Sequence, residues 1–161
     1  MKLQTKLGSL DIKEEDIITF PRGILGFADY RQYVIVEQEE GFFSFLQSVD
    51  EPGLAFVIMI PELVNLDYSV KLAPEEIELL QLKTPDDGRV YGIVTVPDNV
   101  AEMTVNLQAP LVINVKEKLG AQVIQMEGSY HTRHNVLAEM QKNVYLQTRK
   151  SAAAEKMKET V

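Results

Sequence analysis

The chain has 161 residues, no cysteine and a formal net charge of −8. This length is enough for one domain with a buried core, and the lack of cysteine excludes disulfides, zinc-thiolate sites and thiol nucleophiles. No run approaches the roughly 18 consecutive apolar residues that a membrane helix needs, so we expect a soluble, cytoplasmic protein that makes no membrane contact.

Charge is unevenly distributed along the sequence. Residues 1–118 carry 20 acidic and 10 basic side chains, whereas residues 119–161 carry 4 acidic and 6 basic ones. An acidic body repels phosphate, so direct binding to RNA or DNA is not expected. Such a surface suits a basic protein partner and would repel RNA that approaches this partner. An acidic surface also keeps proteins soluble, which is the simpler reading.

The first third of the chain has the pattern of short strands. Apolar and polar residues alternate from Leu3 to Leu7, and short strands are also expected at residues 16–20 and 33–37. The segment Gly26 to Tyr30 fits at most a single helical turn, because it is short and begins with glycine.

A buried hairpin is predicted between Phe43 and Pro61. The turn sequence Glu51-Pro52-Gly53 separates two apolar runs, since proline presets its own backbone angle and glycine can take a positive φ. The second run, from Leu54 to Ile60, is apolar throughout and fits a strand that is buried on both faces. Polar residues lie at the edge of this hairpin, before and within the turn.

The second half continues the strand pattern after one short helix. Pro74 suits a first helical position, and two glutamates follow it near the positive end of the helix dipole. Further strands are predicted at residues 89–96, 103–108, 111–115 and 121–126, with Pro110 interrupting the middle pair.

The last predicted element is a C-terminal helix that begins near His134. Val136, Leu137, Met140 and Val144 form an apolar stripe about 100° wide. We therefore expect a mainly β, antiparallel barrel-like fold of about eight short strands, with one or two short helices and the C-terminal helix. Residues 1–161 are expected to form a single domain, with residues 134–161 as a helical extension.

No catalytic, cofactor-binding or metal-binding residue is predicted. His131 and His134 have helical spacing but no third ligand nearby. The glycines of PRGILGF lack the lysine and hydroxyl residue of a phosphate loop. Ser48 and Asp50 have no histidine close in sequence, and a serine without a base is inert.

Three blocks of sequence stand out because they occur together and in order: ITFPRGILGF at 18–27, FLQSVDEPGLAFVIMIP at 45–61 and VNLQAPLVIN at 105–114. With these blocks the chain resembles the flagellar assembly factor FliW family from Leu3 to about Tyr145. The resemblance implies a barrel-like β fold and a cytoplasmic regulator that is not an enzyme. Members of that family bind flagellin and, once flagellin is exported, the RNA-binding repressor CsrA, which relieves repression of the flagellin message.

The candidate partner contacts are polar residues at the hairpin edge, polar residues of the 103–108 strand and residues of the C-terminal helix. They are Gln47, Ser48, Asp50, Glu51, Asn106, Gln108, Met140, Val144 and Tyr145. The competing interpretation is structural: the polar residues satisfy backbone groups and fix turns, and the apolar residues of the helix pack against the barrel.

A small β-barrel that binds a flavin or a similar ligand is the alternative from another functional class. Barrels can hold a ligand at their mouth, and four phenylalanines could line such a site: Phe42, Phe43, Phe45 and Phe56. Aromatic residues at strand spacing are, however, more often part of a protein core.

Overall fold

The structure is a computed structural model that describes residues 1–39, 41–126 and 128–142. These residues form ten strands: β1 (Lys2–Thr5), β2 (Gly8–Asp11), β3 (Ile18–Thr19), β4 (Gln32–Glu37), β5 (Phe43–Ser48), β6 (Ala55–Met59), β7 (Gly88–Thr95), β8 (Thr104–Asn114), β9 (Leu119–Gln122) and β10 (His134–Asn135). The predicted short helix is α1 (Pro74–Leu79), and residues 136–142 are also helical. The prediction of a mainly β fold is confirmed.

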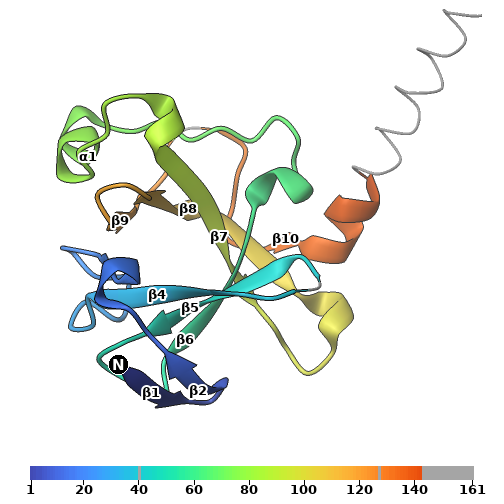
Figure 1. Cartoon of the computed structure of the whole chain (residues 1–161). Coiled ribbons are helices and arrows are strands. Elements are labelled where there is room, and N and C mark those ends of the chain that lie inside the picture. Colours follow the sequence, from blue (N-terminus) through green and yellow to red (C-terminus); the bar gives the residue numbers. More distant parts are fainter. Residues whose placement is uncertain (40, 127, 143–161) are drawn as a thin grey trace, which may run out of the picture.

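Seven strands close into a barrel in the order β8, β7, β6, β5, β4, β3 and β9, and β9 pairs back with β8. The barrel-like fold was predicted, and its strands are antiparallel except where β3 and β9 pair in parallel through Thr19 and Leu119. Strand β10 pairs with β8 outside the barrel, and β1 with β2 forms a separate hairpin (Figure 1).

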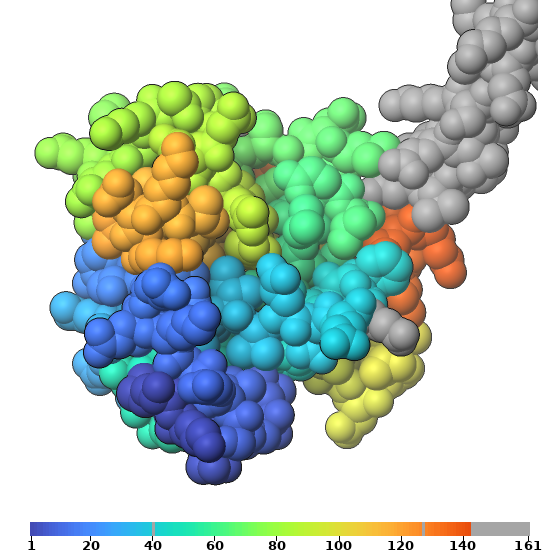
Figure 2. Space-filling model, viewed as in Figure 1, coloured from blue at the N-terminus to red at the C-terminus, as the bar shows by residue number. Residues whose placement is uncertain are grey.

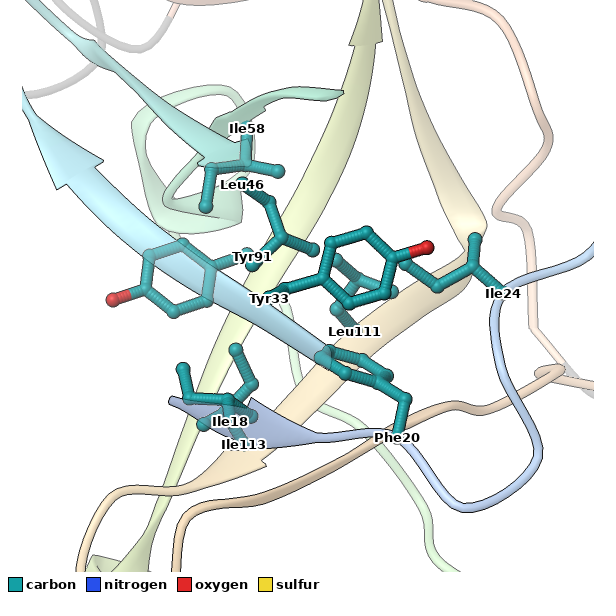
Figure 3. Packing of buried hydrophobic residues seen from close by; sticks show 9 residues of the cluster. All are labelled: Ile18, Phe20, Ile24, Tyr33, Leu46, Ile58, Tyr91, Leu111 and Ile113. Carbon is teal, nitrogen blue, oxygen red and sulfur yellow. The ribbon is translucent and has the colours of Figure 1, made fainter. Parts of the chain in front are cut away.

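Nine buried side chains from six barrel strands and two loop positions fill the interior, as Figure 3 shows: Ile18, Phe20, Ile24, Tyr33, Leu46, Ile58, Tyr91, Leu111 and Ile113. Phe20 and Tyr33 pack edge to face, with their ring centroids 5.4 Å apart. A ring pair of this geometry adds to the free energy gained by burial. The inside of the barrel is therefore a packed core.

The predicted hairpin is β5 and β6. Gln47 pairs with Ala55 at the end of the ladder, and the Ser48 N–H donates to the Leu54 carbonyl at 2.9 Å. The turn between the strands is thus closed by backbone hydrogen bonds, and its sequence predicted its position correctly.

The predicted break at Pro110 is wrong, because β8 runs through this proline without interruption. The register with β7 jumps from Tyr91 opposite Leu111 to Ile93 opposite Asn106, so residues 107–110 bulge away from β7. A proline within a strand is tolerated at such a bulge, where no ladder N–H is required.

Asn106 and Gly92 make this bulge possible. The Asn106 Oδ1 accepts the N–H groups of Gln108 at 3.1 Å and Ala109 at 2.9 Å, which β7 leaves without partners. On β7, a Cβ at Gly92 would lie 2.5 Å from Cγ2 of Val105. The bulge thus needs an amide on one strand and a glycine on the other.

The C-terminal helix starts later than the sequence indicated. His134, the expected start, belongs to β10, and the helix occupies residues 136–142 of the described part. Val136 is fully buried, whereas Leu137 is 39% exposed. Residues 143–161 lie outside the described residues, and no helix that the structure describes is long and apolar enough to cross a membrane.

Candidate functional site

A tight loop between β3 and β4 holds two apolar side chains in solvent. Leu25 is 63% exposed and Phe27 is 37% exposed. Gly23 and Gly26 have φ values of +67° and +85°, which are favourable only for glycine. A Cβ at Gly23 would also lie 2.6 Å from the Cα of Ala28. The loop therefore depends on both glycines for its shape.

Hydrogen bonds fix this loop against the barrel. Gln122 on β9 accepts the Leu25 N–H through Oε1 at 2.9 Å, while its Nε2 donates to the Ala109 carbonyl of β8 at 3.0 Å. Within the loop, the Phe27 N–H donates to the Ile24 carbonyl at 2.7 Å. Because the backbone is already ordered, a partner that contacts Leu25 would lose little conformational entropy there.

Beside Leu25 lies a groove of about 320 Å³, lined by Ile24, Leu25, Phe56, Ile93, Thr95, Asn106, Gln122, Thr132 and Arg133. Phe56 also packs edge to face against Phe27, with ring centroids 5.2 Å apart. We call these residues together with Phe27 the Leu25 groove. Each of the three sequence blocks contributes to it, through Leu25, Phe56 and Asn106.

Two stacked imidazoles hold one wall of the Leu25 groove. The rings of His131 and His134 are 3.7 Å apart and almost parallel. The backbone N–H of His131 donates to Nε2 of His134 at 3.0 Å, and the backbone N–H of Arg133 donates to Nδ1 of His131 at 3.3 Å. Both imidazoles accept a backbone N–H here, and these bonds hold Thr132 and Arg133 at the groove.

The environment of His134 favours its neutral form. Burial lowers the pKa of this imidazole, and the neighbouring His131 lowers it further. The Glu139 carboxylate, 3.5 Å from Nδ1, partly opposes this shift. The resulting pKa is below the usual value for histidine, because desolvation penalises the charged ring.

Gln47 and Ser48 have no exposed surface in this structure. The Gln47 Nε2 donates to backbone carbonyls of the turn, and the Ser48 Oγ accepts the Glu51 N–H at 2.9 Å. A partner could touch these two side chains only after the turn had opened, and their contact with a partner stays a prediction.

Asp50 and Glu51 are exposed at the same turn. The Asp50 Oδ2 accepts the Gln32 N–H at 3.4 Å, and the Glu51 Oε1 accepts the Gly53 N–H at 3.3 Å. Both bonds are long, so both carboxylates remain accessible to a partner.

The remaining predicted residues are divided between three places. Asn106 is half-buried in the Leu25 groove and supports the bulge, which also contains Gln108. Met140 is half-buried and packs against the core cluster around Met59 and Val136. Val144 and Tyr145 lie outside the described residues.

Sequence reasoning missed Leu25, Phe27 and Arg133. The available signal for Leu25 and Phe27 was their place in the glycine-rich segment PRGILGF. This segment lies between strands, so burial in a strand does not explain its apolar residues. The contribution of Arg133 had no local signal, because it depends on how β10 pairs with β8.

The four phenylalanines of the ligand-binding alternative do not surround one site. Phe42 and Phe43 line a separate groove of about 580 Å³ at one end of the barrel, bordered by the cyan and green segments in Figure 2. Phe56 belongs to the Leu25 groove, and Phe45 is half-buried in β5. Since the interior is packed, the aromatic residues form core and surface contacts and no common pocket.

Comparison with known proteins identifies the family. A family model described as FliW protein matches residues 2–136. Flagellar assembly factor FliW of Alkaliphilus metalliredigens is 46% identical over 158 residues, covering 96% of this chain and 98% of that protein. Flagellar assembly factor FliW of a Geobacillus strain is 41% identical over 140 residues, which cover 86% of this chain and 97% of that protein.

A solved structure agrees with these sequence matches. The crystal structure of the flagellar assembly factor FliW superimposes with a TM-score of 0.80 at 41% identity, over 84% of this chain and 96% of that one. The chain therefore belongs to the FliW family, whose members are flagellar assembly factors and not enzymes.

Proposed function

We propose that this protein binds flagellin in the cytoplasm and, when flagellin has been exported, binds the translational repressor CsrA. Capture of CsrA relieves repression of the flagellin message, so synthesis follows export. The observation that carries this proposal is the rigid display of Leu25 and Phe27 beside a groove. Exposed apolar side chains on an ordered backbone are typical of protein-binding surfaces.

The switch needs no chemical step. If one copy cannot hold flagellin and CsrA together, free flagellin lowers the fraction that is available to CsrA by mass action. Overlapping sites or two coupled sites would both produce this competition, and in either case each partner weakens the other by the same factor.

The acidic body supports the CsrA part of the proposal. An RNA-binding protein carries cationic groups that neutralise phosphate, and such a surface is complementary to acidic side chains. Asp50 and Glu51 are exposed carboxylates on a turn whose shape is fixed by Gln47 and Ser48.

Calorimetry with purified flagellin and purified CsrA tests the proposed function. We expect the full chain to bind each partner and flagellin to weaken its apparent affinity for CsrA. We also expect the chain to displace flagellin-message RNA from CsrA in a gel-shift assay. A full chain that binds neither partner would contradict the proposal.

The double substitution Asp50→Lys with Glu51→Lys should weaken CsrA binding about tenfold, or about 1.4 kcal/mol, because two attractive charges become repulsive. The control is Glu75→Lys with Glu78→Lys on the exposed face of α1, which changes the net charge equally. Figure 1 places α1 far from the turn after β5. Calorimetry that gives equal losses for both double variants would remove this turn from the binding surface.

A further inference from the structure

The Leu25 groove differs in charge from the rest of the body. Among the described residues that line it, Arg133 carries the only formal charge, and the others are apolar or neutral. By contrast, residues 1–118 carry 20 acidic and 10 basic side chains. The groove is thus an apolar surface with one cation on an otherwise acidic protein.

The Arg133 backbone is fixed where it borders the groove. Its N–H donates to His131, and the His131 carbonyl accepts the Leu107 N–H of β8 at 3.1 Å. The Arg133 side chain is exposed. A guanidinium in such a position pairs best with a carboxylate, which can accept two of its N–H donors.

The chemistry of the Leu25 groove disfavours a basic partner. Of the two proposed partners, CsrA must present cations to bind RNA, and Arg133 would repel them while no lining carboxylate of the described groove attracts them. Flagellin is under no such constraint.

The size of the groove indicates how a partner would enter it. At about 320 Å³ it is at the lower end of the range for sites that hold a drug-sized molecule. Such a volume accommodates a few side chains of one protein segment. Leu25, Phe27 and Phe56 would contact the apolar side chains of that segment.

We infer that the Leu25 groove binds flagellin, through a segment that presents apolar side chains beside a carboxylate, and that CsrA binds a different, acidic surface. This inference rests on the proposed function and divides it between two sites. Competition between the two partners then arises by coupling or by steric contact of the bound proteins outside the groove.

The test is to measure binding of flagellin and of CsrA to single variants of the full chain. Leu25→Ala removes apolar contact but leaves the backbone hydrogen bond to Gln122, and Arg133→Glu reverses the charge. Each should weaken flagellin binding by a factor of about ten. CsrA affinity should change by less than about twofold, because neither position faces it.

Matched controls use equivalent residues on other surfaces. Ile124→Ala removes an apolar side chain that is 52% exposed, and Arg89→Glu reverses a charge in the groove at the barrel end. Both should leave flagellin affinity unchanged. Urea denaturation of all four variants verifies that each is folded.

A series at Arg133 tests the carboxylate itself. Flagellin affinity should fall from Arg to Gln and again from Gln to Glu, since the first change removes attraction and the second adds repulsion. Equal affinity across the series, or a loss of CsrA binding as large as that of flagellin, would overturn the inference. In both cases the wild type still binds its partners, so the proposed function would stand.

Discussion

Gln47 stabilises the turn after β5 from a position with no exposed surface. Its Nε2 lies 3.0 to 3.1 Å from the carbonyl oxygens of Ser48, Pro52 and Leu54. A primary amide has two N–H donors, so three acceptors share them. Without this amide, carbonyls beneath the turn would be buried with fewer donors, which is costly.

Replacing Gln47 with leucine should lower the free energy of unfolding by about 2 kcal/mol, since three carbonyls of the turn each lose one donor. Equilibrium urea denaturation measures this loss. The same substitution at Gln4, whose exposed side chain donates to the Ser9 Oγ at 3.3 Å, is the control. Equal stability of the two variants would show that the amide does not support the turn.

The sequence indicated a polar rim at Gln47 and Ser48, because polar residues near a turn are usually exposed to solvent. That rule assumes a strand with one solvated face. Here Gln47 and Ser48 are fully buried, and their amide and hydroxyl groups bond to the backbone of the turn that follows β5. Asp50 and Glu51, two residues further, do reach solvent as expected.

At the scale of elements, β10 and the turn before it are the least predictable part of the described chain. The apolar stripe correctly indicated a helix, but it gave His134 as its start. The two-residue pairing of β10 with Val105 and Thr104 leaves no periodic signal. Likewise, the continuity of β8 through Pro110 depends on Asn106 and Gly92, which lie on different strands.

His134 makes the stability of this turn sensitive to pH. Because burial lowers the pKa of His134 below the ordinary value of 6.5, the unfolded chain binds a proton more readily than the folded one. Stability is then fully present above about pH 6.5 and is lost as the pH falls below it towards the folded pKa. Protonation of Nε2 would also break the hydrogen bond from the His131 N–H.

Urea denaturation at pH 7.5 and 5.5 should therefore show a loss of stability for the wild type that is smaller in His134→Gln. Glutamine can still accept the His131 N–H but does not titrate. A His131→Gln variant measures how far the neighbouring ring contributes to the lowered pKa of His134. Identical pH profiles for the wild type and His134→Gln would contradict this assignment.

For the whole molecule, alternation and turn sequences predicted the strands but not how the barrel closes. The closing pair joins Thr19 to Leu119, and no local pattern specifies a pairing so distant in sequence. Closure also brings the three sequence blocks to one groove. Their convergence, and with it the role of Leu25, is a property of the barrel and not of any single segment.

The division of charge over the molecule predicts different salt dependence for the two proposed partners. The acidic body would steer a basic partner by long-range attraction, which salt screens over a Debye length of about 10 Å at 0.1 M. Burial of apolar surface around Leu25 responds much less to moderate salt. Stopped-flow association should therefore slow about tenfold or more for CsrA between 0.02 and 0.5 M salt, but only slightly for flagellin.

The Asp50→Lys, Glu51→Lys variant should flatten the salt dependence of CsrA association, whereas Leu25→Ala should leave it steep. Equally steep dependences for both partners would mean that flagellin, too, associates through the acidic surface.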